Sequence, residues 1–183
     1  MPDSSEAGST VDVTAAAREG EGHWSLDPAK SSVEFHVKHF WGLITVHGRF
    51  ERFEGDGTVG PDGAISGRLV IDAASLTTKN RKRDEHLRSA DFFDVEHHPK
   101  VVATAHDVVP TGPTALRGRV TLEAAGHEQE LDATMPVLEA GPGAVTLRCE
   151  LVVDRTAHAM TWNPLGMTSR HAQAVVTAHF VRS

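Results

Sequence analysis

The chain has 183 residues, 39% of them apolar, and a formal net charge of −7 at pH 7. That length suits one domain with its own core and is short for two. The acidic charge argues against nucleic acids and anionic membrane surfaces as partners, because both attract basic patches. No apolar stretch approaches the length of a membrane-spanning helix, so no transmembrane segment is expected. Cys149 is the one cysteine of the sequence, which excludes an intramolecular disulfide and a cysteine-based zinc site.

The first 22 residues hold five acidic side chains against one basic side chain, Arg18, among small and polar residues. Such a segment buries too little apolar surface to offset the entropy lost on ordering. We therefore predict a disordered acidic tail at residues 1–22 and a single domain at residues 23–183. The tail lacks a basic region followed by an apolar stretch, so we expect no signal peptide and a cytoplasmic location.

From Trp24 onward, apolar and polar residues alternate with a period of two, which is typical of β-strands with one buried face. The clearest strands are expected at residues 33–38, 65–72, 116–123, 145–153 and 174–180. Weaker strands fit residues 45–53, 100–107 and 128–135. The connections have turn chemistry at Gly55-Asp56-Gly57, Pro61-Asp62-Gly63, Gly112-Pro113, Gly126 and Gly141-Pro142-Gly143.

About eight strands of this kind predict an all-β fold, a lipocalin-like antiparallel barrel, because closure removes the edges of the sheet. A barrel of about eight strands encloses either packed side chains or one small ligand. One short helix is expected at about residues 80–89, within a charged run that leads into Phe92-Phe93. A helix inserted between barrel strands is expected to cover an open end. That arrangement indicates a cavity, and a cavity indicates a ligand.

Two apparent motifs have simpler interpretations. Residues 55–60 match the glycine pattern GxGxxG, but a dinucleotide site needs a helix after the motif, and here a turn and another strand follow. We interpret the glycines as a hairpin loop. His127-Glu128 begins like a zinc-protease motif, but Leu131 stands where the second histidine ligand belongs.

The twelve histidines leave a metal site open as an alternative. Scattered ligands can converge on a β-scaffold, although solvated or hydrogen-bonded histidines are the more common outcome. His39 and His47 would approach each other across a hairpin. The residues that would join them from the helical region are His86, His97, His98, Asp84, Asp91 and Asp94.

Three further features each have two interpretations. The basic residues Arg81, Lys82, Arg83 and Arg88 could grip an anionic head group or form ordinary ion pairs on a solvated helix. Phe92-Phe93 could pin the helix to the barrel, form a cavity wall, or do both. The apolar loop at residues 160–167 could pack into the core or close a cavity as a lid.

Several motifs then occur in a characteristic order. They are Trp24-Ser25-Leu26-Asp27-Pro28, Ser31-Ser32-Val33-Glu34-Phe35, Lys38-His39, Gly48-Arg49-Phe50, Phe53-Glu54-Gly55, Ser75-Leu76-Thr77, the run from Arg83 to Ser89, Asp91-Phe92-Phe93-Asp94, His98-Pro99 and Val153-Asp154-Arg155. With these motifs, residues 24–181 resemble the YceI-like family of small bacterial lipocalin-like proteins. The resemblance implies an extended eight-stranded barrel whose elongated apolar cavity takes long-chain amphiphiles of the polyisoprenoid or isoprenoid-quinone type. We expect no cofactor.

We therefore expect a non-catalytic protein that binds, sequesters or transports an apolar or amphipathic small molecule, polyisoprenoid-, quinone- or fatty-acid-like. The expected ligand-binding residues are Phe35, Val37 and Phe50 on the first strands, Leu87, Phe92 and Phe93 near the helix, Met160, Trp162 and Leu165 in the closing loop, and Arg83, His86 or His39 at a polar head group. Two alternatives stay open: a His/Asp-based metal-binding protein or enzyme, and a protein-interaction module with a filled barrel. A homodimer also stays open.

Overall fold

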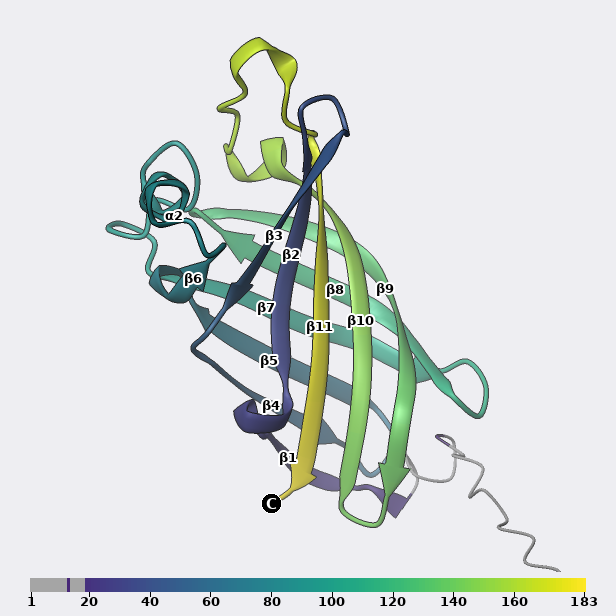
Figure 1. Cartoon of the computed structure of the whole chain (residues 1–183). Coiled ribbons are helices and arrows are strands. Elements are labelled where there is room, and N and C mark those ends of the chain that lie inside the picture. The colour runs from purple at the N-terminus through teal and green to yellow at the C-terminus, as the bar shows by residue number, and fades with distance from the viewer. Residues whose placement is uncertain (1–12, 14–18) are drawn as a thin grey trace, which may run out of the picture.

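The computed structural model describes Val13 and residues 19–183. Within these residues one antiparallel sheet closes on itself (Figure 1). Its strands are β1 (Gly22–Leu26), β2 (Ser32–His39), β3 (Ile44–Phe50), β4 (Phe53–Val59), β5 (Ile65–Asp72), β6 (Leu76–Thr77), β7 (Lys100–Pro110), β8 (Ala115–Ala124), β9 (His127–Gly141), β10 (Ala144–Asp154) and β11 (His171–Arg182). The helical elements are α2 (Arg81–Arg88) and the 3-10 turns η1 (Pro28–Lys30), η2 (Ala73–Ser75), η3 (Arg155–His158) and η4 (Pro164–Gly166).

Eight strand positions close the ring. β1 and β2 together occupy one position as an interrupted strand, and β3 and β4 together occupy the next. Gly22 on β1 lies opposite Val59 on β4, and Val33 on β2 lies opposite Phe50 on β3. β11 pairs with β1 near its C-terminal end and with β2 along the rest of its length. β6 pairs with the last two residues of β3. The predicted antiparallel barrel of about eight strands is therefore confirmed.

The two interruptions have local causes. Pro28, which has no N–H to donate, opens η1 directly after Asp27, whose carboxylate caps the turn. On the neighbouring strand, the amides of Glu51 and Arg52 donate to the Ser75 hydroxyl. After this interruption β4 pairs with β5 along its whole length. Before it, β3 has only the two residues of β6 beside it on that side. One end of the barrel is thus open, and α2, the β2–β3 hairpin and the segment between β10 and β11 gather there (Figure 1).

The glycines at residues 55–57 lie inside β4, so their prediction as a hairpin loop was wrong. A side chain at Gly55 would place its Cβ 2.9 Å from the Arg68 carbonyl oxygen, so the close approach of β5 favours glycine in this strand. The turn instead begins at Gly60, whose amide donates to the Ala64 carbonyl. Because β5 rather than a helix follows, the structure also lacks the context of a dinucleotide site here.

Helix α2 confirms the helix predicted at about residues 80–89. The side chain of Asn80 accepts a hydrogen bond from the Arg83 amide and caps the first turn. Asp84 is buried and accepts hydrogen bonds from the amide and hydroxyl of Thr78 at 2.8 and 2.5 Å. Arg88 donates to carbonyls of the segment before the helix. The helix is therefore fixed against the end of the barrel. None of the helices in the described residues is long and apolar enough to cross a membrane.

Two clusters of buried apolar side chains form the core. The first packs between β7, β8, β9 and β10 and contains Val108, Leu116, Val120, Ala133, Met135, Val137, Leu151 and Val153. The second borders the open end and contains Val33, Phe50, Ile71, Ala73, Leu76, Phe92, Val101, Ala124 and Met160. Most of these side chains come from alternate residues of their strands, as a period of two requires. Val13 also contacts the first cluster.

The predicted acidic tail lies for the most part outside the described residues. Of its final residues, Gly20 accepts a hydrogen bond from the Trp24 indole at 2.9 Å, and the Glu21 carbonyl accepts one from the Arg182 guanidinium. β1 begins at Gly22, so the barrel includes the last residue assigned to the tail.

Candidate ligand-binding cavity

A cavity of about 630 Å³ lies at the open end of the barrel, a volume typical of small-molecule sites. Its walls come from β2, β3, α2, the Phe92-Phe93 segment, the ends of β8 and β10, the η3 region and β11. Most of the lining side chains are apolar. The polar ones include Lys82 and Arg83 on α2 and Arg155 and His158 in η3.

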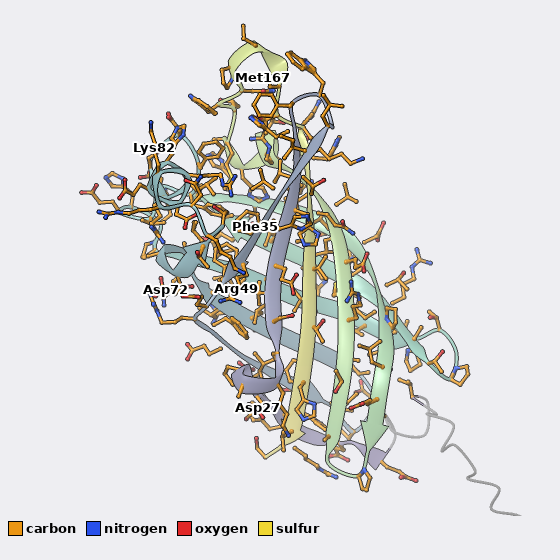
Figure 2. All side chains as sticks on the ribbon, in the orientation of Figure 1. Asp27, Phe35, Arg49, Asp72, Lys82 and Met167 are labelled. Carbon is orange, nitrogen blue, oxygen red and sulfur yellow. The ribbon has the colours of Figure 1, made fainter. Side chains whose placement is uncertain are left out.

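The inward face of β2 forms one wall. Val33, Phe35 and Val37 line the cavity, as the alternation along this strand predicts. The Phe35 ring lies over Gly48 on β3: a Cβ on that glycine would come within 2.2 Å of the ring, so only glycine leaves it room. The position of Phe35 on β2 is visible in Figure 2. Phe35 also packs against Phe50, with 5.5 Å between the ring centroids.

The Phe92-Phe93 segment forms a second wall. Phe93 packs edge-on against Phe50 with 5.6 Å between ring centroids, and its amide donates to the Leu87 carbonyl at the end of α2. Phe92 is buried and also lines the cavity. The segment therefore acts both as core packing and as cavity wall, so neither of the two interpretations excludes the other.

An aromatic cluster connects α2 to the loop between η3 and η4. The His86 ring packs edge-on against Trp162 and Phe92, with centroid distances of 4.5 and 5.1 Å. Trp162 and Phe92 also contact each other at 5.8 Å. His86 is held by a 2.9 Å contact between its Nε2 atom and an Asp91 carboxylate oxygen. The packing of Trp162 against His86 and Phe92 therefore holds the indole in the cavity lining.

All the predicted ligand-binding residues except Leu165 line this cavity. They are Phe35, Val37, His39, Phe50, Arg83, His86, Leu87, Phe92, Phe93, Met160 and Trp162. Leu165 is 83% exposed and lies outside it, which corrects its predicted place in the closing loop. The Asn163 side chain donates to the Thr168 carbonyl and accepts from its amide, closing a turn that leaves Leu165 in solvent.

The β2–β3 hairpin, whose Phe40 lines the cavity, carries exposed apolar side chains. Phe40 and Trp41 form the tip of the β2–β3 hairpin. Their φ angles are positive, 50° and 52°, a backbone conformation that residues other than glycine rarely adopt. Trp41 is 70% exposed and Leu43 is 85% exposed. The Trp41 amide donates to the Met167 carbonyl, which ties the hairpin tip to the loop after η4. Figure 2 shows Met167 at that end of the molecule.

The polar groups predicted to meet a head group are already engaged with protein atoms. Arg83 donates from Nε to the Thr78 hydroxyl at 2.7 Å and from Nη2 to the Thr78 carbonyl at 3.1 Å. His39 Nδ1 lies 2.8 Å from the Thr168 hydroxyl. Together with the His86–Asp91 contact, these bonds fix the polar rim before any ligand arrives.

Two buried polar residues of the lining were not predicted as site residues. Arg155 and His158 are 6% and 1% exposed. Burial lowers the pKa of Arg155, and its guanidinium donates to the carbonyls of Ser169 and Met160 at 2.8 and 2.9 Å. One sequence feature indicated this region, the Val153-Asp154-Arg155 motif, and no feature marked His158.

The prediction that His39 and His47 approach each other across the β2–β3 hairpin is wrong. Residues 40–43 occupy the turn, so His47 lies opposite His36, with 4.5 Å between the ring centroids, and His39 lies opposite Ile44. His97 contacts Asp94, whose carboxylate raises the pKa of that imidazole. Within Val13 and residues 19–183, no group of three or more His, Cys, Asp or Glu side chains is arranged to hold a metal ion.

Cys149 lies on the inward face of β10, beside the first core cluster. Burial raises the pKa of its thiol from 9.0 to about 11. The thiolate is the reactive form and is populated only as the pH approaches that pKa. We therefore expect iodoacetamide at pH 8 to alkylate Cys149 about 100-fold more slowly in the native protein than in urea-unfolded chain. Mass spectrometry of timed samples measures both rates, and equal rates would contradict the burial of this thiol.

Comparisons with known proteins agree with this architecture. A family model described as the YceI-like domain matches residues 24–180. A UPF0312 protein of Staphylococcus aureus (strain USA300) is 27% identical over 122 residues, which cover 66% of this chain and 69% of that relative. BcnA of Burkholderia cenocepacia has a TM-score of 0.76 at 19% identity and covers 84% of this chain and 98% of its own.

A second solved structure is a polyisoprenoid binding domain from Saccharophagus degradans implicated in plant cell wall breakdown. It has a TM-score of 0.71 at 15% identity, with coverage of 87% of this chain and 98% of that chain. At identities this low, the two structures establish a shared fold alone.

Proposed function

Because the chain belongs to the YceI-like family, we propose that its barrel binds an amphipathic long-chain lipid of the polyisoprenoid or isoprenoid-quinone type. The observation that carries this proposal is the apolar cavity of about 630 Å³, which is lined in part by α2 and the β2–β3 hairpin. The polyisoprenoid binding domain of similar fold supports the choice of ligand class. The exposed apolar side chains of Trp41 and Leu43 on the same hairpin as the lining residue Phe40 would offer an apolar chain a first contact beside the cavity.

Burial of the chain would supply the affinity. Removing about 300 Å² of apolar ligand surface from water contributes roughly 8 kcal/mol before the costs of association are subtracted. Directional contacts are not needed for that term, so a cavity of this kind tolerates variation in chain length and unsaturation. Its walls are fixed before binding by the contacts among Phe35, Phe50 and Phe93, which lowers the ordering cost.

We propose sequestration or transport of this lipid rather than its chemical conversion. The Cys149 thiol has a pKa of about 11 and so remains protonated at neutral pH. His86 and Arg83 are each held by neighbouring protein groups rather than aimed together at one point of the cavity. A binding role requires only the apolar lining of the cavity.

Native mass spectrometry of the purified protein, followed by organic extraction, tests the proposal. We expect a lipid to co-purify, or to bind after incubation with isoprenoid alcohols, quinones and fatty acids in turn. Urea-unfolded protein treated in the same way is the control for nonspecific attachment. A bare mass under all of these conditions would reject lipid binding and favour an interaction module.

A further inference from the structure

His158 has an unusual hydrogen-bonding state for a buried residue of the cavity lining. Its Nδ1 atom lies 3.0 Å from the carbonyl oxygen of His127 and 3.3 Å from that of Ala124. Both partners are acceptors, so Nδ1 must carry a proton and donate it. In the neutral ring the Nε2 atom then carries a lone pair and acts as an acceptor.

That acceptor has no partner among the residues that the structure describes. Within the described part of the chain, His158 Nε2 is the buried side-chain polar atom left without a hydrogen bond. Buried polar groups are nearly always paired, because an unpaired one has lost its bonds to water without replacing them. The ring belongs to the cavity wall, so a donor arriving in the cavity is the natural partner for this atom.

Arg155 supplies a complementary donor from the same short element. Its Nε and Nη1 atoms donate to the carbonyls of Ser169 and Met160. No carboxylate of the described residues forms an ion pair with it, since the adjacent Asp154 pairs with Arg170. A buried guanidinium without an anionic partner keeps donor capacity for an oxygen atom of a ligand.

We propose that Arg155 and His158 form a head-group site for a lipid that ends in a hydroxyl group, an isoprenoid alcohol or phenol. The ligand O–H donates to His158 Nε2, and its oxygen accepts a hydrogen bond from the Arg155 guanidinium. This inference rests on the proposed lipid binding and adds the chemistry of the polar end. A hydroxyl both donates and accepts, whereas an ether oxygen or a fully ionised phosphate only accepts.

The test compares three probes with the same twenty-carbon chain: geranylgeraniol, its methyl ether and its monophosphate. Isothermal titration calorimetry measures each dissociation constant with the full chain. We expect the wild-type protein to bind the alcohol about 10-fold more tightly than the ether, the usual effect of one satisfied buried hydrogen bond.

His158→Asn isolates the contribution of Nε2. The asparagine amide can still donate to the His127 carbonyl in place of Nδ1, but nothing replaces Nε2. We expect this variant to bind the alcohol and the ether with equal affinity. His171→Asn is the matched control, because His171 is exposed at the start of β11 and lies outside the cavity lining. That variant keeps the preference for the alcohol.

The outcomes separate this inference from the proposed function. Equal affinity of the wild-type protein for alcohol and ether leaves lipid binding intact and overturns the head-group site. A retained preference in His158→Asn, or tightest binding of the monophosphate, overturns it as well. If no probe binds, the proposed function fails and the head-group site with it. The wild-type comparison decides the matter even if His158→Asn does not fold.

Discussion

Ala174→Phe is expected to weaken lipid binding by at least about 100-fold while the barrel stays folded. Ala174 faces inward on β11, opposite Phe35 on β2 and Leu151 on β10, and lines the cavity. A phenyl ring at this position occupies the space that a lipid chain would fill. Because the ring enters existing empty volume, it adds buried apolar surface without the overpacking that destabilises a filled core.

Val152→Phe is the matched control for this prediction. Val152 lies on the outer face of β10, opposite Gln173, and is 65% exposed. The same ring is thus added one residue away from the Leu151–Ala174 pair, but outside the barrel. Calorimetry measures lipid affinity, and urea denaturation measures the free energy of unfolding. Wild-type affinity in a folded Ala174→Phe protein would place the lipid somewhere other than this cavity.

The parts of the fold that depend on short-range patterns were predictable from the sequence. A period of two along residues 33–37 determines that Phe35 and Val37 share a face, and the structure places both in one cavity wall. The charged run from Lys79 to Arg88 predicted a helix, and in the structure Asn80 caps α2. These features depend on residues within a few positions of each other, where the sequence pattern is sufficient.

Features that depend on distant partners were not predictable in the same way. By composition, the glycines of β4 indicate a turn. In the structure β5 lies beside them, and the close approach of the Arg68 carbonyl oxygen favours glycine at residue 55. Similarly, the length of the turn at residues 40–43 decides that His47 pairs with His36. A composition-based interpretation treats glycine as a turn signal and cannot include the neighbouring strand.

The candidate site shows the same division. The predicted apolar walls follow from alternation and from the helix, but the burial of His158 depends on carbonyls that lie at least 31 residues away in sequence. Leu165 was placed in the cavity because it is apolar, whereas the Asn163–Thr168 hydrogen bonds turn it outward. The cytoplasmic location and the disordered tail stay predictions.

Asp84→Ala is expected to lower the free energy of unfolding by about 2–4 kcal/mol. The Asp84 carboxylate is buried and accepts three hydrogen bonds, from the amide and hydroxyl of Thr78 and from the Thr77 hydroxyl at 3.2 Å. Hydrogen bonds to a charged acceptor are stronger than neutral ones. Alanine would leave the donors of buried Thr78 without their partner, which adds a desolvation cost to the lost bonds.

Glu85→Ala provides a control at the next residue of the same helix. The Glu85 carboxylate is exposed and pairs with Arg81 at 3.0 Å, one turn earlier on α2. Exposed helical pairs of this spacing contribute about 0.3–0.5 kcal/mol. Both variants remove one negative charge from the same helix. The difference between their urea midpoints therefore isolates the buried hydrogen bonds of Asp84 from the effect of net charge.

The stability lost in Asp84→Ala should be concentrated at the cavity end of the barrel, because Asp84 fixes α2 to the segment that contains β6. Helix α2 contributes Arg83, His86 and Leu87 to the cavity lining. In Asp84→Ala we expect faster hydrogen exchange of the α2 amides and weaker lipid binding, with little change in the strands β8 to β10. A loss of stability no larger than that of Glu85→Ala would contradict this role, since the helix would then depend on its other contacts alone.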